Sequence, residues 1–372
     1  KEGFDRIPMW VADMNFPTVP TVVEAMMGRV QHPAYGYFDP TKEYYDSIIR
    51  WQETRNGVTG LKPEHIGYEN GVLGGVISAL NVMCSKGDNV LLHSPTYIGF
   101  TMSLENNGYH IVHSPLVKDE NGVWRMDFED MEKKIAEKHI HAAVFCSPHN
   151  PCGRVWERWE IEKAMELYKK YDVFVISDEI WSDLTLEGHK HIPTQSVNEY
   201  AHEHTFAFYA PSKTFNLAGL VGSYHIVYNS YLRDRLMEAE KCSHYNSANV
   251  LSISALMGAY TKEGAEWVDE LREVLTQNVD YAYTYITTHF EGVSVAKAQG
   301  TYMLYLDCSG WLNEHPEMTM DDLIRAGIAV GVVWQDGRPF MNPNTIRMNL
   351  AVPHALVKEA MDRLDKYVFN AK

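Results

Sequence analysis

HAAVFCSPHNPCGRVW, residues 141–156, joins a short apolar run to a turn in which two prolines enclose His149 and Asn150. The run HAAVFC is typical of a strand that is buried on both faces of a sheet. Each proline restricts its own backbone and that of the preceding residue, so Asn150 has little conformational freedom. An ordinary turn needs less restriction. We therefore expect Asn150 to be held in place for chemistry, and we assign His149 only to the turn.

On both sides of this stretch, segments typical of strands alternate with segments typical of helices. Three further apolar runs predict strands, at NVLLH (89–93), VFVIS (173–177) and HTFAFY (204–209). Helical periodicity occurs between them, at 71–84, 127–138 and 159–172. Strands that alternate with helices predict an α/β fold, in which a mostly parallel sheet is covered by helices on both faces.

The C-terminal part of the sequence has a different character. A long helical stretch at 267–290 precedes two nearly alternating apolar segments, TYMLYLDC (301–308) and TIRMNLAV (345–352). These segments predict the strands of a smaller α+β unit. The first 20 residues lack helical periodicity, and we place them in the same unit. We predict a large domain at 21–270 and a small domain made of 1–20 and 271–372.

Composition excludes some classes of partner. The chain has 372 residues and a net charge of −16, which argues against nucleic acid or an anionic membrane as the main partner. No apolar run is long enough to span a bilayer. The 5 cysteines are dispersed, which is typical of reduced thiols in a cytoplasmic protein. We interpret HKH (189–191) as a solvated loop and predict no metal site.

Polar residues follow four of the predicted strands, where parallel sheets bind their ligands. They are an aromatic ring, an amide, a carboxylate and an amine, from Tyr97, Asn150, Asp178 and Lys213. Each has a simpler alternative when taken alone. Asp178 could cap a helix, Lys213 could be exposed, and Tyr97 could belong to the core or its rim.

A glycine-rich stretch, ENGVLGGV (69–76), precedes and enters the first predicted helix. Its backbone N–H groups could bind a phosphate, or its glycines could serve only packing. The stretch is not the dinucleotide-binding fingerprint, and the sequence has no Walker motif. Together with the four groups at the strand ends, a phosphate site gives the set of groups that pyridoxal phosphate requires. A carboxylate keeps the cofactor's pyridine nitrogen protonated, and a lysine holds its aldehyde.

The order and spacing of these groups resemble the fold-type I pyridoxal-phosphate enzymes, the aspartate aminotransferase superfamily. The closer resemblance is to the MalY/PatB family of cystathionine β-lyases and cysteine-S-conjugate β-lyases. The stretches that carry it are PMWVADMNF (8–16), YGYFDPTKEY (35–44), SPTYIGF (94–100), FCSPHNPCGRVW (145–156), ISDEIWSDL (176–184), APSKTFNLAGL (210–220) and IRMNLAVP (346–353). This resemblance implies an aspartate-aminotransferase-like large domain with a smaller α+β domain.

The resemblance also implies roles for residues around the cofactor ring. Lys213 would hold the cofactor aldehyde and act as the general base. Asp178 would pair with the pyridine nitrogen, and Tyr97 would stack on the ring. Asn150 would donate a hydrogen bond to the phenolic oxygen and could also contact the substrate carboxylate.

Further implied roles concern the phosphate and the substrate. The backbone at Val72 and Leu73, together with Ser212, would bind the phosphate. Tyr37 would reach the phosphate of a neighbouring subunit, which implies a homodimer. Arg347 would bind the substrate α-carboxylate through its planar guanidinium, although a surface arginine on a strand is the simpler alternative.

Two positions differ from the family pattern and bear on the substrate. Ile98 stands where the family often has a second tyrosine, and Trp181 stands where it often has histidine. We expect β-elimination, in which L-cystathionine or another S-substituted cysteine gives a thiol, pyruvate and ammonia. The alternative enzyme is an aminotransferase that uses the same residues. A third hypothesis, from another class, is a regulatory protein that acts through protein–protein contacts.

Overall fold

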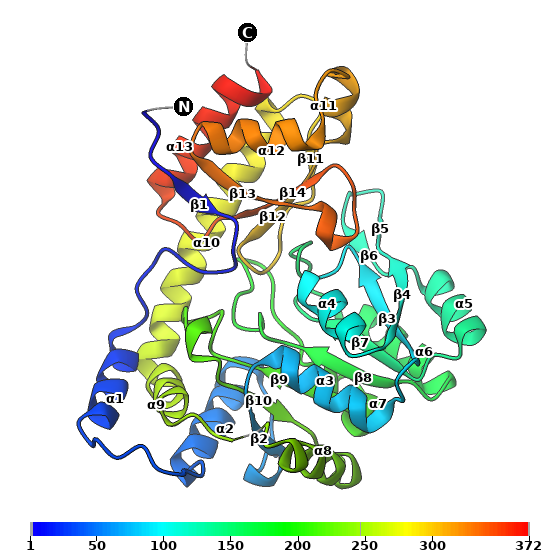
Figure 1. The fold of residues 1–372 in the computed structure, drawn as a ribbon, viewed down its shortest axis with the longest axis vertical. Helices are drawn as coiled ribbons and strands as arrows, with labels where there is room; N and C mark the ends of the chain where they lie inside the picture. Colours follow the sequence, from blue (N-terminus) through cyan, green and yellow to red (C-terminus); the bar gives the residue numbers. More distant parts are fainter. Residues whose placement is uncertain (1–2, 246, 371–372) are drawn as a thin grey trace.

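The computed structural model describes residues 3–245 and 247–370, and its main strands form two sheets (Figure 1). The larger sheet has seven strands, in the order β2 (Ile66–Glu69), β10 (Ser223–Ile226), β9 (Thr205–Tyr209), β8 (Phe174–Asp178), β7 (Ala142–Cys146), β3 (Asn89–Ser94) and β4 (His110–Pro115). From β9 to β4 neighbouring strands are parallel, whereas β10 is antiparallel to both of its neighbours. The prediction of a mostly parallel sheet is confirmed.

Helices cover both faces of this sheet because successive side chains of each strand point to opposite sides. On β7, Val144 packs with α3 (Val72–Met83), α4 (Ile98–Asn106) and α8 (Ser230–Ser243). The next residue, Phe145, packs with α5 (Phe128–Lys138) and α6 (Arg158–Lys170) on the other face. The continuous apolar run in the sequence therefore reflects burial on both faces.

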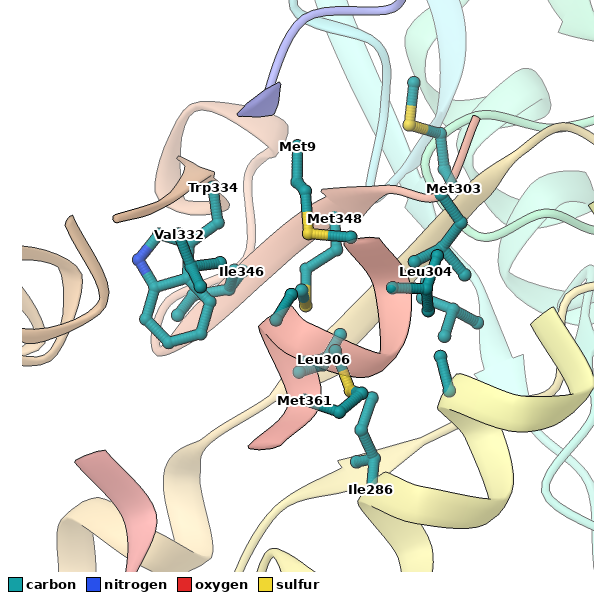
Figure 2. Packing of buried hydrophobic residues seen from close by; sticks show 14 of the residues in the cluster. Met9, Ile286, Met303, Leu304, Leu306, Val332, Trp334, Ile346, Met348 and Met361 are labelled. Atoms are coloured by element: carbon teal, nitrogen blue, oxygen red, sulfur yellow. The ribbon is translucent and has the colours of Figure 1, made fainter. Parts of the chain in front are cut away.

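The smaller sheet has five strands, in the order β1 (Ile7–Met9), β13 (Val332–Asp336), β14 (Thr345–Asn349), β12 (Met303–Asp307) and β11 (Ser294–Val295). Figure 2 shows its core, in which strand residues such as Leu306 and Met348 pack toward Ile286 and Met361. Ile286 belongs to α10 (Lys262–His289) and Met361 to α13 (His354–Leu364). Apolar burial from two helices thus stabilises this sheet.

Strand β1 places the start of the chain beside residues more than 300 positions later, since Ile7 pairs with Val332. The chain then runs to α1 (Pro20–Val30), which packs closely against α9 (Val250–Ala259). A Cβ on Gly258 of α9 would lie 2.5 Å from the carbonyl oxygen of Thr21, so only glycine permits this approach. The domain division at residues 20 and 270 stays a prediction, since α10 passes through residue 270 as one helix.

The remaining elements connect and flank the two sheets. They are α2 (Lys42–Asn56), α7 (Glu199–His204), α11 (Ser309–Glu314), α12 (Met320–Ala329), the hairpin β5 (Val117–Lys118) and β6 (Trp124–Arg125), and the short turns η1 (Pro63–His65), η2 (Thr194–Ser196), η3 (Ala218–Leu220), η4 (Arg338–Phe340) and η5 (Asp365–Phe369). Within the described residues, no helix is both long enough and apolar enough to cross a membrane.

Candidate active site

A cavity of about 350 Å³ opens where the strands of the larger sheet end. Seven of the residues predicted for the site line it: Val72, Leu73, Tyr97, Asn150, Asp178, Ser212 and Lys213. They come from positions up to 141 residues apart in the sequence, and the parallel topology brings them together. Arg347 joins them through a hydrogen bond to Asn150.

Lys213 lies in the turn after β9, and its Nζ donates to the carbonyl oxygen of Ala12 at 3.2 Å. Burial lowers the pKa of its amine, and Arg347 lowers it further, while Asp13 and Asp178 act in the opposite direction. A buried amine with a lowered pKa loses its proton more easily, which suits a base or a nucleophile. The simpler alternative of an exposed lysine is wrong.

Asp178 is the last residue of β8, and its Oδ1 accepts the backbone N–H of Ile180 at 3.0 Å. Within the described residues this carboxyl makes no other hydrogen bond, and it lies in the buried wall of the cavity. Burial raises its pKa to about 7, although Lys213 nearby lowers it. The helix-cap alternative is wrong, because a turn and not a helix follows. A cationic partner in the cavity would compensate for the buried charge.

Arg347 lies on β14, where its guanidinium is buried and stacks 4.7 Å from the ring of Phe340. Its Nη1 donates to Oδ1 of Asn150 at 3.1 Å, and its Nη2 donates to the carbonyl of Trp10 at 3.0 Å. The Nε atom is buried and has no hydrogen-bond partner among the described residues. Burial lowers the pKa of Arg347 to about 10. The surface-arginine alternative is therefore wrong, and the Nε–H is among the N–H groups of this guanidinium that no described residue accepts from.

The contact with Arg347 also fixes how Asn150 faces the cavity. Because its oxygen accepts from Arg347, its NH₂ group remains as the donor, and within the described residues this group has no hydrogen-bond partner. The peptide bonds before Pro148 and Pro151 are both cis. The backbone of His149 closes the turn by donating to the carbonyl of Arg154 at 2.8 Å.

Helix α3 presents its N-terminus to the cavity. It begins after Gly71, whose φ of 93° favours glycine, and no side chain caps its first N–H groups. Two later glycines are required by packing, since a Cβ on Gly74 would lie 1.9 Å from the Tyr245 hydroxyl and one on Gly75 would lie 2.3 Å from Phe208. The stretch thus serves both functions that the sequence left open: its glycines pack, and its uncapped N–H groups can bind an anion.

These groups fit the cofactor that the resemblance implies. Among residues 3–245 and 247–370, Asp178 has no ion-pair partner, the α3 N-terminus has no side-chain cap, and the NH₂ of Asn150 has no acceptor. A pyridinium nitrogen, a phosphate and a phenolic oxygen would supply these three partners, and Lys213 would hold the aldehyde. The assigned roles themselves stay predictions.

Tyr37 is not brought to this cavity. Its side chain is fully exposed, and it lines a different cavity, of about 700 Å³, together with Tyr35 and Tyr45. Any contact between Tyr37 and a cofactor phosphate would therefore have to come from another copy of the chain.

Segment 10–16 also contributes to the site, through its backbone, and no sequence pattern predicted this contribution. The Ala12 carbonyl accepts from Lys213 and also from Tyr302, at 2.9 Å. Asn349 donates to the carbonyls of Val11 and Asp13, at 2.6 Å each. Because carbonyl groups occur in every residue, no side-chain pattern marks this segment, although Asn349 and the stretch PMWVADMNF belong to the motifs quoted above.

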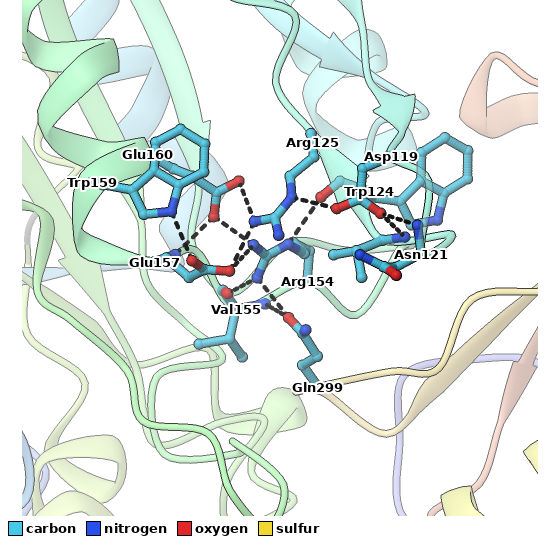
Figure 3. A network of polar contacts seen from close by, with 11 residues as sticks. Asp119, Asn121, Trp124, Arg125, Arg154, Val155, Glu157, Trp159, Glu160 and Gln299 are labelled. Carbon is cyan, nitrogen blue, oxygen red and sulfur yellow. Dashed lines mark hydrogen bonds and ion pairs between the residues drawn. The ribbon is translucent and has the colours of Figure 1, made fainter.

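The opposite side of the Asn150 turn carries a network of charged side chains (Figure 3). Arg154 donates to the carbonyls of Trp124 and Val155, to Gln299, and to the carboxylates of Glu157 and Glu160. Its five N–H groups are all used. Gln299 belongs to the segment before β12, and its backbone N–H donates to the carbonyl of Gly153 at 2.8 Å. This network therefore connects the turn to the segment that leads into the smaller sheet.

Comparison with known proteins assigns this chain to a family. A family model described as aminotransferase class I and II matches residues 7–364. Cystathionine beta-lyase PatB of Bacillus subtilis (strain 168) is 35% identical over 82% of this chain and 79% of that protein. Protein MalY of Escherichia coli (strain K12) is 30% identical over 96% of this chain and 90% of that protein.

Solved structures agree with the sequence relatives. The PLP-bound C–S lyase from Staphylococcus hominis has a TM-score of 0.89 and 30% identity, over 98% of this chain and 94% of that chain. The resemblance to the MalY/PatB family and the predicted fold are both confirmed. Since the family match includes every residue that lines the cavity, the chain belongs to the class I and II aminotransferase family.

Proposed function

We propose that this chain is a pyridoxal-phosphate-dependent carbon–sulfur β-lyase. Its substrates would be L-cystathionine or related S-substituted L-cysteines, and its products a thiol, pyruvate and ammonia. The observation that carries the proposal is the convergence of Lys213 and Asp178 at one cavity, with Arg347 hydrogen-bonded to Asn150 in its wall. The relatives named cystathionine beta-lyase and C–S lyase favour elimination over transamination.

Each part of the cofactor would be held by residues of the cavity. The N-terminus of α3, at Val72 and Leu73, would bind the phosphate together with Ser212. Asp178 would accept the ring N–H, Asn150 would donate to the phenolic oxygen, and Tyr97 would cover the ring. When bound, pyridoxal phosphate supplies an electron-withdrawing ring that stabilises negative charge at the substrate Cα.

Arg347 would orient the substrate. Its buried guanidinium has a free Nε–H, and its Nη1 already contacts Asn150 at 3.1 Å. A substrate α-carboxylate could accept from this edge of the guanidinium in a short, charge-assisted contact. The contact would place the Cα hydrogen within the same cavity as the amine of Lys213.

Lys213 would move the protons. Its lowered pKa favours the neutral amine, which can accept the Cα proton. The Cβ–S bond then breaks, its electrons leave with sulfur, and the thiolate takes up a proton. One water is consumed overall, so one S-substituted cysteine yields one thiol, one pyruvate and one ammonia.

We also propose a homodimer, in which Tyr37 reaches the phosphate site of the partner. Its full exposure, and the exposed apolar side chains of Val23, Met27 and Val30 on α1, support a second copy as the covering surface. Light scattering of the purified protein tests this. A monomer with full activity would contradict it. The cytoplasmic location stays a prediction.

The test of the activity is incubation of the purified holoenzyme with L-cystathionine, with assays for pyruvate and free thiol. We expect both products in equal amounts without any added keto acid. Lys213→Ala is the control, and it should lose both the yellow colour and the products. If product forms only when a keto-acid acceptor is added, the protein is an aminotransferase and the lyase proposal is wrong.

A further inference from the structure

A second carboxylate, Glu179, lies directly behind Asp178 and faces away from the cavity. It is fully buried, and both of its oxygens are saturated. Oε1 accepts from the Ser177 hydroxyl at 2.9 Å and from the Thr194 N–H at 3.1 Å. Oε2 accepts from the Tyr209 hydroxyl at 2.6 Å and lies 2.6 Å from Nε2 of His191. Four polar groups thus contact this buried carboxylate, two at each oxygen.

The partner His191 belongs to HKH (189–191), which we expected to be a solvated loop. That expectation is wrong for His191, whose exposed fraction is only 4%. The following segment is held against the sheet as well, because Gln195 donates to the carbonyls of Thr205 and Ile226, at 2.9 and 3.0 Å. Residues 191–196 therefore form a polar layer behind the strands that carry the site.

The hydrogen bonds of Glu179 connect two strand ends. Its own backbone N–H donates to the carbonyl of Phe208 on β9, at 2.9 Å, and its side chain binds Tyr209, the last residue of β9. Tyr209 is followed within four residues by Ser212 and Lys213. The position of Asp178 relative to the Lys213 turn thus depends on contacts that Glu179 makes.

Glu179 also acts on Asp178 through its charge. Asp178 has its pKa raised to about 7, first by burial and also by Glu179. On the other side of Asp178, the amine of Lys213 has the opposite effect. The groups that face Glu179 itself are His191 from the 189–196 segment and Tyr209 from β9, with Tyr224 and Tyr228 farther away in its field.

We propose that Glu179 is a positioning residue of the cofactor site. It holds the ends of β8 and β9 together through Tyr209, and its negative charge strengthens the hold of Asp178 on the proton of the cofactor ring nitrogen. The inference rests on the proposed function, since it assumes that pyridoxal phosphate is the ligand of the cavity.

The test compares two ligands that differ only at the ring nitrogen. Apo-protein is titrated with pyridoxal phosphate and with its 1-deaza analogue, in which carbon replaces that nitrogen, and both dissociation constants are measured. The wild type should prefer pyridoxal phosphate. Glu179→Gln should reduce this preference by about tenfold, equivalent to one pK unit. If Glu179 served packing alone, Glu179→Gln would weaken the binding of both ligands equally. An unchanged preference in this variant would therefore overturn the charge effect.

Two further variants separate charge from position. Glu69→Gln is the matched control, because Glu69 is equally buried and bonds a histidine, His225 at 2.6 Å, but lies on β2. It should leave the preference unchanged. Tyr209→Phe keeps the charge of Glu179 but removes one strand-end contact, so it should weaken both ligands without reducing the preference.

If Glu179→Gln does not fold, Tyr209→Phe still tests the proposal. Should Tyr209→Phe bind both ligands with wild-type affinity, the positioning role would be overturned. A wild type that binds neither ligand would refute the proposed function instead, so the two failures are distinguishable.

Discussion

The turn at 147–156 has two sides that differ in how completely their polar groups are paired. On the cavity side, as far as the described residues show, Nε of Arg347 has no partner and Asp178 accepts a single backbone N–H. On the other side, Arg154 uses all of its N–H groups, and Glu160 pairs with both Arg154 and Arg125. Arg154 and Glu160 are as buried as Arg347 and Asp178, so exposure does not explain the difference.

A buried polar group without a partner costs free energy, and folded proteins retain few of them. On the cavity side a ligand would supply the missing partners, whereas in the charged network of Figure 3 the N–H groups of Arg154 are all paired and Glu160 forms ion pairs with Arg154 and Arg125. Substitutions on the cavity side should therefore reduce activity and leave the apo-protein stable. Substitutions in the network should reduce stability first.

Lys213→Ala should have the largest effect of all. Loss of the base and of the covalent attachment should lower the rate of pyruvate release by at least about 10⁴-fold. The thermal midpoint of the apo-protein should not fall, because the amine makes only one hydrogen bond, to a carbonyl. Steady-state kinetics check the rate, and a melting curve checks the thermal midpoint. A variant that loses stability along with activity would place Lys213 in the scaffold and break the comparison.

Much of the larger sheet could be predicted, because parallel strands buried on both faces produce continuous apolar runs such as HAAVFC. Three strands were missed: the edge strands β2 and β4, and β10 next to β2. The sequences of β2 and β10, IGYE and SYHI, contain Glu69 and His225, which pair with each other at 2.6 Å and so can be buried in the sheet. Such pairing joins positions far apart in the chain and leaves no local pattern.

The strand-end residues of the candidate site could be predicted for the same reason. The ends of parallel strands converge, and a residue at the end of a continuous apolar run is easy to identify. The expectations that were wrong or missing concern groups whose hydrogen-bond partners lie on another part of the chain. His191 was expected in solvent because its partner Glu179 precedes it by twelve residues on another element. Ala12 was missed because it contributes a carbonyl oxygen and not a side chain.

Arg154→Met should have the second-largest effect, which is a loss of folding stability. Removing the guanidinium leaves the buried carboxylate of Glu160 without its closest partner, which typically costs about 3–5 kcal/mol. Urea unfolding of the apo-protein measures it. The matched control is Arg158→Met on the same helix as Glu160, since Arg158 and Glu162 form an exposed pair at 3.6 Å worth less than about 1 kcal/mol. Equal losses in the two variants would contradict the argument.

Asp178→Asn should raise the stability of the apo-protein, by an amount that depends on pH. The folded state holds the Asp178 proton up to about pH 7, whereas an unfolded aspartate loses it near its ordinary pKa. Wild-type stability from this group therefore falls as pH rises between these two values. The variant lacks this fall, so its advantage should grow with pH to about 4 kcal/mol above pH 7. Unfolding curves from pH 4 to pH 8 would refute this if the two proteins stay parallel.

Arg347→Lys should lower kcat/KM for the amino-acid substrate by about 100-fold, because an ammonium cannot reproduce the planar contact with a carboxylate. Binding of pyridoxal phosphate should change little. If cofactor affinity falls as much as kcat/KM, Arg347 serves the cofactor site and not the substrate carboxylate.

Asn150→Ala should have the smallest effect and is the sharpest test of the comparison, since Asn150 lies in the same turn as Arg154. Its NH₂ group has no partner among the described residues and its Oδ1 accepts from Arg347, so stability should fall by no more than one hydrogen bond contributes, about 1 kcal/mol. Activity should fall by about tenfold, the size expected for one hydrogen bond. Without this donor to the phenolic oxygen, the yellow colour should persist to higher pH, which a spectrophotometric titration detects. An unchanged colour profile and rate, together with a lower unfolding midpoint, would assign Asn150 to the scaffold, and both sides of the turn would then be structural.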